Sequence, residues 1–346
     1  MKPDQTHINS WLAARKSQRA ARNEISLLEG LQNGSRAALG QAITLIESSK
    51  PADQLIAQQL LRALPQSAQI AKRIGITGVP GVGKSTFIEN LGLQLVAQGH
   101  KVAVLAIDPS SSRTGGSILG DKTRMERLSQ ELNVFIRPSA AGRTLGGVAK
   151  HTREAIALCE AAGYDIILVE TVGVGQSETL VHGMVDFFLL LMLAGAGDEL
   201  QGIKRGIMEL ADTIVINKAD GQNEAAAKAA RSEYAGALHV FSQRPDNWQP
   251  RVLCTSGING TGLSELWSQI ESFFVHMQLN GALQNKRKDQ ELLLFEQLHT
   301  DLLQQQFLAD PSQKEKFTEL KASIACGNLL AYEACAVLLQ GFNQDN

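Results

Sequence analysis

The segment that most constrains how this chain can fold lies at residues 78–86 and reads GVPGVGKST, which fits the pattern GxxxxGK[ST]. It follows the apolar run at residues 73–76 and precedes a helix-forming stretch, so it joins a predicted strand to a predicted helix. Glycines let main-chain N–H groups approach phosphate oxygens without an intervening Cβ, and the helix N-terminus adds a favourable partial charge. The predicted phosphate-binding loop consists of Gly78, Val79, Pro80, Gly81, Val82, Gly83, Lys84, Ser85 and Thr86.

Two side chains of this loop have specific expected roles. Lys84 should reach the β- and γ-phosphates, where its ammonium group offsets their negative charge. The hydroxyl of Ser85 should bind Mg²⁺. The pattern therefore predicts that the chain binds a nucleoside triphosphate together with Mg²⁺.

Apolar runs of strand length alternate with segments of helical length from about residue 72 to residue 277. This alternation is typical of an α/β fold with a mostly parallel, doubly wound sheet that helices cover on both faces. Ligands of such sheets bind beyond the carboxyl ends of the strands. The predicted strands are residues 73–77, 101–107, 134–137, 165–170, 187–193, 213–217 and 251–255.

Segments without strand patterns flank this region. Residues 1–71 are predicted to form an N-terminal helical extension, in which Ser35 caps one helix and Pro51 opens another. Residues 72–280 form the predicted P-loop domain. Residues 281–346 are predicted to be helical, with a capping box that begins at Asp310. Their apolar content favours either a dimerisation arm or a cap on the chain's own sheet.

Composition narrows the possible partners and location. The formal net charge of −2 gives no reason to expect nucleic acid or an anionic membrane as a partner. The four cysteines form no CxxC pair, which is typical of buried thiols in a reducing compartment. The first residues lack the apolar core of a signal peptide, and the most apolar run, residues 187–196, is too short to cross a bilayer. We therefore expect a cytoplasmic protein.

A second motif indicates which base is bound. Residues 217–220 have the form NKxD and follow a predicted strand. The carboxylate of Asp220 can accept hydrogen bonds from the ring N–H and the exocyclic amine of guanine, a donor pair that adenine lacks. The segment after the last predicted strand is placed to supply main-chain N–H groups to the guanine oxygen. The predicted residues that bind the base of GTP or GDP are Asn217, Lys218, Asp220, Ser256, Gly257 and Ile258.

Three acidic residues are candidates for binding Mg²⁺ or directing water near the phosphates. Glu170 lies in Glu-x-x-Gly and can serve Mg²⁺ directly or through a water. Asp108 can orient the attacking water or a water bound to Mg²⁺. Asp121 is either a metal ligand of a loop that closes or the N-cap of a short helix. The predicted metal set is Ser85, Asp108, Asp121 and Glu170, and the catalytic candidates are Lys84, Asp108 and Glu170.

Several long motifs, in one order, resemble the MeaB/ArgK family, the methylmalonyl-CoA mutase-associated GTPases. They are the segment 75–85, the Asp-Pro-Ser-Ser at 108–111, TGGSILGDKTRM at 114–125, VETVGVGQSE at 169–178 and DELQGIK at 198–204. The resemblance implies a P-loop GTPase fold, and it implies that the predicted phosphate, base and metal residues above match the family's motifs.

The resemblance also implies partners. It implies slow GTP hydrolysis coupled to a cobalamin-dependent acyl-CoA mutase such as methylmalonyl-CoA mutase, for which the GTPase acts as a chaperone that gates cobalamin loading. It implies a homodimer joined through the C-terminal helices, and a partner-coupling role for the loop at 198–204. A solvated loop is the alternative interpretation of that segment. Gly257 stands where relatives often have alanine, so we expect its backbone contact to be kept but held less rigidly.

Two other functions are compatible with a P-loop fold. A nickel-delivery GTPase shares the glutamate represented here by Glu170, but it would be favoured by a histidine-rich tail or a Cys/His pair, and the sequence has neither. A transport-linked ATPase or kinase corresponds to an older name for the family. The carboxylate of Asp220 argues against ATP, because adenine would leave it unpaired.

Overall fold

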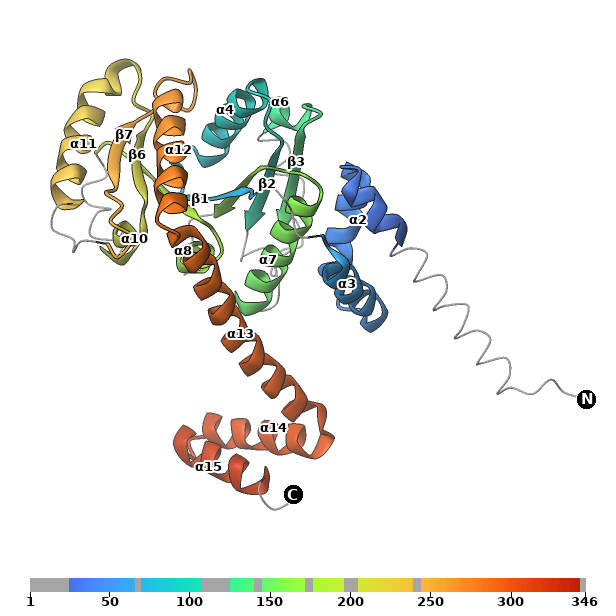
Figure 1. Cartoon of the computed structure of the whole chain (residues 1–346). Coiled ribbons are helices and arrows are strands. Elements are labelled where there is room, and N and C mark those ends of the chain that lie inside the picture. The colour runs from blue at the N-terminus through green and yellow to red at the C-terminus, as the bar shows by residue number, and fades with distance from the viewer. Residues whose placement is uncertain are drawn as a thin grey trace, which may run out of the picture. The chain divides into compact units, whose positions relative to one another are not determined.

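In the part of the chain that the structure describes, seven strands form one sheet in the order β3-β2-β4-β1-β5-β6-β7, and all neighbouring strands run parallel (Figure 1). The computed structural model describes residues 25–65, 70–107, 125–139, 145–171, 177–195, 205–238 and 244–342. The predicted α/β fold with a parallel, doubly wound sheet is confirmed, and each strand end lies within two residues of its predicted position. The strands are β1 (Lys72–Gly78), β2 (Val102–Ile107), β3 (Val134–Ser139), β4 (Ile166–Thr171), β5 (Phe187–Leu193), β6 (Thr213–Asn217) and β7 (Arg251–Cys254).

Helices connect the strands and extend the chain at both ends of the described region. Residues 25–32 are helical. The other described helices are α2 (Arg36–Ile46), α3 (Pro51–Ala63), α4 (Lys84–Ala97), α6 (Glu126–Ser129), α7 (Leu145–Ala161), α8 (Ser177–His182), α10 (Arg205–Leu210), the 3₁₀ turn η2 (Gly221–Asn223), α11 (Glu224–Leu238), α12 (Leu263–Leu279), α13 (Ala282–Ala309), α14 (Pro311–Ala325) and α15 (Ala331–Phe342).

The sheet is buried on both faces because its strands are apolar at nearly every position. In β2, Ala103 and Leu105 point into a core shared with α2, α3 and α7, whereas Val102 and Val104 point into a core shared with α4, α6 and α12. A third cluster packs α10 and α11 against β5, β6 and β7. This two-sided burial accounts for the continuous apolar runs that alternating strands would not show.

The N-terminal helices belong to the same core as the sheet. Leu39 and Ile43 of α2 and Leu60 of α3 are fully buried in the cluster that includes β2 and α7. Ser35 caps α2, since its hydroxyl accepts a hydrogen bond from Ala38 N at 3.3 Å, and Pro51 occupies the first position of α3. The predicted caps of both helices are therefore present.

A cluster of buried charges lies at the amino ends of β5 and β6, at the edge of the sheet opposite the phosphate loop. Asp186, which is fully buried, accepts hydrogen bonds from Arg287 Nε at 2.8 Å and Arg287 NH2 at 2.6 Å, and from the main-chain N of Arg73 at 3.0 Å. Asp212, also fully buried, pairs with Arg244 at 2.7 Å and with Lys286 at 3.9 Å. Burial raises the pKa of Asp212, and the two cations partly offset that effect. These bonds fix the first two turns of α13 to the sheet.

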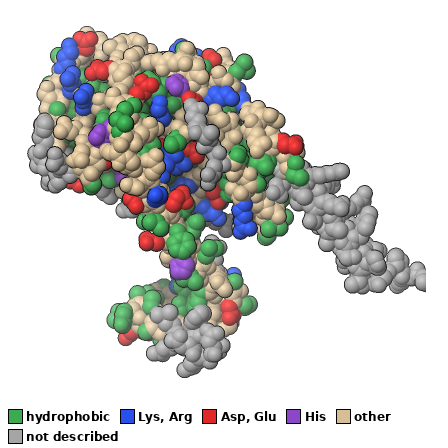
Figure 2. Space-filling model, in the orientation of Figure 1, with side chains coloured by type: hydrophobic (Ala, Val, Ile, Leu, Met, Phe, Trp, Pro, Cys, Tyr) green, Lys and Arg blue, Asp and Glu red, His purple; other side chains and the backbone are tan. Residues whose placement is uncertain are grey.

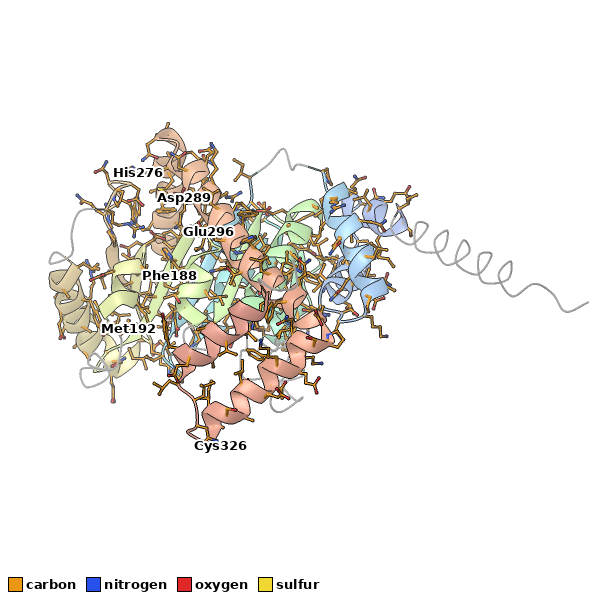
Figure 3. The ribbon with its side chains drawn as sticks, turned by 90° about the horizontal axis from the view of Figure 1, so that it is seen from below. Phe188, Met192, His276, Asp289, Glu296 and Cys326 are labelled. Atoms are coloured by element: carbon orange, nitrogen blue, oxygen red, sulfur yellow. The ribbon has the colours of Figure 1, made fainter. Side chains whose placement is uncertain are left out.

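The C-terminal helices form a second compact unit, Asp289–Asn346. Asp310 accepts a hydrogen bond from Ser312 N at 2.8 Å and so caps α14, as predicted. Hydrophobic side chains lie at the surface of this unit in Figure 2. Its first residue, Asp289, and the C-cap of α14, Cys326, are labelled in Figure 3. No described helix is long and apolar enough to cross a membrane.

Removal of the Arg287 guanidinium tests the buried charge cluster. Arg287→Met keeps an apolar stem but leaves the carboxylate of Asp186 without its bidentate partner, so we expect the free energy of unfolding to fall by about 3 kcal/mol. Chemical denaturation followed by circular dichroism measures this change. Lys228→Ala is the control, because Lys228 and Glu224 form an exposed pair at 3.7 Å. An equally small effect of both substitutions would contradict the structural role of the cluster.

The buried imidazole of His182 predicts a loss of stability in acid. Burial, together with the nearby cations Lys286 and Arg244, lowers the pKa of His182 to about 4. Above its ordinary pKa of about 6.5 the group is neutral in both states, but in more acidic solution the unfolded chain takes up a proton that the folded chain does not. We expect His182→Gln to remove about 2 kcal/mol of the stability loss between pH 7 and pH 4.5. Parallel stability curves for the variant and the unsubstituted chain would contradict this prediction.

Candidate functional site

The phosphate loop has the backbone geometry that its glycines permit. Gly81 and Gly83 have φ angles of 80° and 92°, in the left-handed region that glycine favours. A Cβ at Gly78 would collide with the carbonyl oxygen of Leu191 on the neighbouring strand. Helix α4 begins at Lys84, so its first turn contains the last three residues of the loop, and Gly83 is its N-cap. Residues 78–86 thus form the predicted turn between β1 and a helix N-terminus.

Lys84 is held inside this loop. Its side chain is buried, and Nζ donates to Gly78 O at 2.7 Å and to Val79 O at 3.2 Å. Burial lowers the pKa of Lys84, whereas the carboxylates of Glu170 and Glu178 raise it. The cation is therefore held by the loop's own carbonyl groups, and two carboxylates act on it electrostatically.

A hydroxyl and a carboxylate meet beside the loop. Ser85 Oγ donates to Glu170 Oε1 at 3.2 Å, and Glu170 is buried at the end of β4. Oxygen ligands of this kind suit Mg²⁺, so the described residues fit the predicted metal. A buried bond from Thr171 Oγ1 to Thr77 Oγ1, 2.8 Å long, joins the ends of β4 and β1 at the residue that follows Glu170.

The NKxD segment contacts the phosphate loop directly. Asn217 is buried at the end of β6, and its Nδ2 donates to Val82 O at 2.9 Å. Lys218 Nζ donates to Gly81 O at 2.8 Å. Lys218 also has a positive φ of 58°, which is unusual for a residue other than glycine. Backbone strain at this position and two bonds to one loop indicate a constrained site.

The segment after β7 completes the arrangement. Asn217 Oδ1 accepts hydrogen bonds from Thr255 Oγ1 at 3.2 Å and from Gly257 N at 3.0 Å. Ser256 Oγ donates to the carboxylate of Asp220. The side chain of Ile258 is 74% exposed. Hydrogen bonds of Asn217 thus link the NKxD segment both to the phosphate loop and to the segment after β7, and Ser256 links that segment to Asp220.

Other nominated residues lie outside the described part of the chain. These are Asp108, Asp121 and the loop at 198–204. Their proposed roles stay predictions. Conversely, three residues at or beside this site were not predicted from the sequence. Thr77 and Thr171 bond to each other next to Gly78 and Glu170 in the chain, and Asn90 bonds to Gly257. The position of each threonine at a strand end was the available signal for the first two; Asn90 lies within a helix and carried no such signal.

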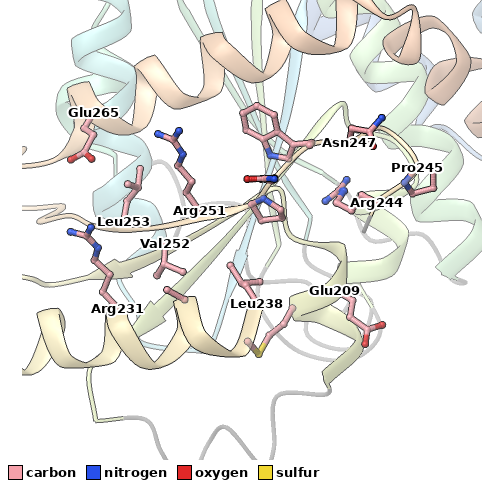
Figure 4. A pocket seen from close by; sticks show the side chains of 15 residues that line it. Glu209, Arg231, Leu238, Arg244, Pro245, Asn247, Arg251, Val252, Leu253 and Glu265 are labelled. Atoms are coloured by element: carbon pink, nitrogen blue, oxygen red, sulfur yellow. The ribbon is translucent and has the colours of Figure 1, made fainter. Parts of the chain in front are cut away.

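A cavity of about 900 Å³ lies elsewhere, beside the edge strand β7 (Figure 4). Its lining comes from α10, α11, α12, β7 and residues 244–250, and it includes Arg231, Arg251 and Glu265. Among the residues nominated for phosphate, base or metal, none that the structure describes lines this cavity. The chemistry of the loops at the carboxyl ends of the strands, rather than the size of this cavity, therefore identifies the candidate site.

Comparison with known proteins identifies the family to which the chain belongs. The family model described as methylmalonyl-CoA mutase-associated GTPase MeaB matches residues 39–312. The GTPase ArgK of Escherichia coli is 50% identical over 273 residues, which cover 78% of this chain and 82% of that protein. The mouse mitochondrial methylmalonic aciduria type A homolog is 44% identical over 326 residues, 91% of this chain and 79% of that protein.

A solved structure is also similar along nearly the whole chain. The crystal structure of a LAO/AO transport system kinase superposes with a TM-score of 0.74 at 37% identity, and the match covers 93% of this chain and 98% of that one. The match to the family model and the similarity to these relatives lead to one conclusion. The chain belongs to the MeaB family of methylmalonyl-CoA mutase-associated GTPases, and it is a GTPase.

Proposed function

We propose that this GTPase is a chaperone for a cobalamin-dependent acyl-CoA mutase, in which hydrolysis of GTP at the carboxyl edge of the sheet times the loading and protection of the mutase's cobalamin. The observation that carries the nucleotide part is the contact of Asn217 and Lys218 with the phosphate loop, at 2.9 and 2.8 Å. It brings a guanine-reading motif and a phosphate-binding motif to one place.

The phosphates of GTP would bind in the loop at residues 78–86. Main-chain N–H groups at the start of α4 face this position and favour an anion. Lys84 Nζ, which donates to Gly78 O at 2.7 Å, would exchange that carbonyl for oxygens of the β- and γ-phosphates. Because the lysine is already fixed by the loop, little side-chain entropy is lost when the nucleotide binds.

Ser85 and Glu170 would hold Mg²⁺, with Asp108 and Asp121 as further candidates from outside the described residues. The ion supplies positive charge to the phosphate oxygens. Glu170 or Asp108 would orient the attacking water. Phosphoryl transfer of this kind needs positioning and charge stabilisation rather than covalent catalysis.

Asp220 would select the base. Its carboxylate, held by the Ser256 hydroxyl, can accept from the ring N–H and the exocyclic amine of guanine. A nucleotide without that donor pair would leave the carboxylate unpaired, and such a mismatch discriminates by about 10⁴. Guanine specificity is therefore proposed to come from this side chain.

Two findings support the mutase as the partner. The family description names methylmalonyl-CoA mutase, and the mouse relative is named after methylmalonic aciduria. We assign the coupling to the loop at 198–204, which follows β5. The chain's four cysteines are free thiols, which accords with our proposal of a reducing cytoplasm. The expectation of buried thiols holds for Cys159 and is wrong for Cys326 and Cys335, which are exposed.

The C-terminal unit supports a homodimer. Its apolar side chains at the surface, with exposed fractions from 37% to 86%, are Leu292, Leu293, Phe295, Leu302, Leu303, Ile324, Leu330, Tyr332 and Val337. A surface with this many apolar side chains is typical of a protein interface. A second copy of the same unit is the proposed partner for this surface.

The name of the solved relative gives a second candidate, a transport-linked kinase. A function of this kind would use ATP. The carboxylate of Asp220 opposes this alternative because adenine offers it no matching donor pair. A competition titration of GDP against ADP separates the two, since a kinase would bind ADP at least as tightly.

Glu170→Gln tests the proposed metal site. The amide keeps the shape of the side chain but removes its charge, so we expect the Mg²⁺ concentration that gives half-maximal GTP hydrolysis to rise about 10- to 100-fold. Glu178→Gln is the matched control, because both carboxylates act on Lys84 but only Glu170 bonds to Ser85. If the two variants respond equally to Mg²⁺, Glu170 is not a metal ligand.

The partner is tested by GTP turnover with and without the cobalamin-dependent acyl-CoA mutase of the same organism. We expect faster turnover when the mutase is added, by up to about 10³–10⁵ if the mutase supplies an arginine to the phosphates. Lys84→Ala, which lacks the phosphate-binding cation, controls for contaminating hydrolases. Equal turnover in both conditions, with the mutase shown to be active, would rule the coupling out.

A further inference from the structure

Asn90 lies on α4, one turn after Thr86, and joins this helix to the predicted base loop. Its Nδ2 donates to Gly257 O at 2.7 Å and to Thr86 O at 3.2 Å. We propose that Asn90 is a positioning residue for guanine recognition, which orients the main-chain N–H of Ile258 toward O6 of the base. The inference rests on the proposed nucleotide site.

The longer of these two bonds is local and the shorter one is not. A side chain that bonds to the carbonyl four residues earlier is a common local contact within a helix. The bond to Gly257 O, by contrast, crosses 167 residues of sequence and is the shorter by 0.5 Å, from the printed lengths of 3.2 and 2.7 Å. The side chain of Asn90 is therefore placed to hold the loop after β7 against the phosphate-loop helix.

Because the peptide group is planar, the bond to Gly257 O also sets the direction of the next N–H group. The carbonyl of Gly257 and the N–H of Ile258 belong to one planar trans peptide, so they point in opposite directions. Asn90 fixes the carbonyl, and it thereby fixes the N–H of Ile258. In the described part of the chain this N–H has no hydrogen-bond partner, whereas the N–H of Gly257 already donates to Asn217 Oδ1 at 3.0 Å.

The order of groups on the base indicates what this donor reads. The edge of guanine presents the exocyclic amine, the ring N–H and O6 in sequence. Asp220 is proposed to accept from the first two, and Ser256 bonds to that carboxylate from the loop that contains Ile258. O6 therefore falls beside this loop, where an oriented N–H is the complementary group.

The same contacts account for how Gly257 is held. A Cβ here would lie 3.3 Å from Phe87 Cα and 3.4 Å from Asn217 Oδ1, which is tight. The glycine is held on both sides instead, at its N–H by Asn217 and at its carbonyl by Asn90. Glycine at this position was expected to hold the backbone less rigidly than alanine would. The two side-chain hydrogen bonds offset that loss of rigidity.

Nucleotide analogues isolate the contact. The binding of GDP, 6-thio-GDP and IDP is measured by calorimetry for the unsubstituted chain and for Asn90→Ala. The first analogue replaces O6 with sulfur, a weaker acceptor, and IDP lacks only the exocyclic amine. We expect Asn90→Ala to weaken GDP about three- to tenfold, because one oriented hydrogen bond is lost. The preference for GDP over 6-thio-GDP should shrink, and the preference for GDP over IDP should not change.

Two further variants distinguish a loss of base recognition from a general loss of folding. Asn90→Asp retains the size of the side chain but sets an oxygen against Gly257 O, so it should lose the 6-thio discrimination at least as fully. Gln94→Ala is the matched control, because Gln94 lies one turn further along α4 and bonds instead to Ser264 Oγ at 3.2 Å. For GTP hydrolysis, Asn90→Ala should raise KM and leave kcat unchanged.

Asp220→Asn separates this inference from the proposed base site. If that site is correct, the substitution reduces the preference for GDP over IDP, whatever Asn90 does. An Asn90→Ala variant that weakens all three nucleotides equally would show that Asn90 only supports the fold, and the inference would be wrong. An unchanged GDP/IDP ratio in Asp220→Asn would instead overturn the proposed reading of the base by Asp220.

Discussion

The candidate site depends on the hydrogen bonds of the buried Asn217 side-chain amide, because they fix both the phosphate loop and the loop after β7. Its Nδ2 donates to Val82 O in the phosphate loop, and its Oδ1 accepts from Thr255 and Gly257 in the loop after β7. An amide has few alternatives once it is buried, since an unpaired donor or acceptor costs about 1–3 kcal/mol. The positions of both loops are therefore set by one side chain at the end of β6.

The two edges of the sheet use charge in different ways. At the amino edge, carboxylates and cations are paired within the fold, as in the bidentate contact of Arg287 with Asp186. At the carboxyl edge, Lys84 bonds to loop carbonyls and Glu170 accepts from Ser85. Their ammonium and carboxylate groups are the ones proposed to bind phosphate and Mg²⁺. Stability at one edge and chemistry at the other is the arrangement expected of a parallel sheet whose ligand lies beyond the strand ends.

The sequence predicted most of the fold because its signals were local. Long apolar runs indicated buried strands, and Ser35, Pro51 and Asp310 marked helix starts that the structure contains. The order of the strands, and contacts such as Asn90 with Gly257 or Arg287 with Asp186, could not be predicted. They join residues far apart in the chain, and a polar residue within a helix looks the same whether it faces water or a distant carbonyl.

The first turns of α13 are bonded to the strand that leads to the phosphate loop. Arg287 bonds to Ala71 O, just before β1, at 2.7 Å, and to Asp186, just before β5, at 2.6 Å. Strand β1 runs without interruption from there to Gly78, where the phosphate loop begins. The start of α13 and the phosphate loop therefore lie at opposite ends of strand β1. A displacement of α13 along this strand would reach the loop through the strand itself, without passing through a flexible linker.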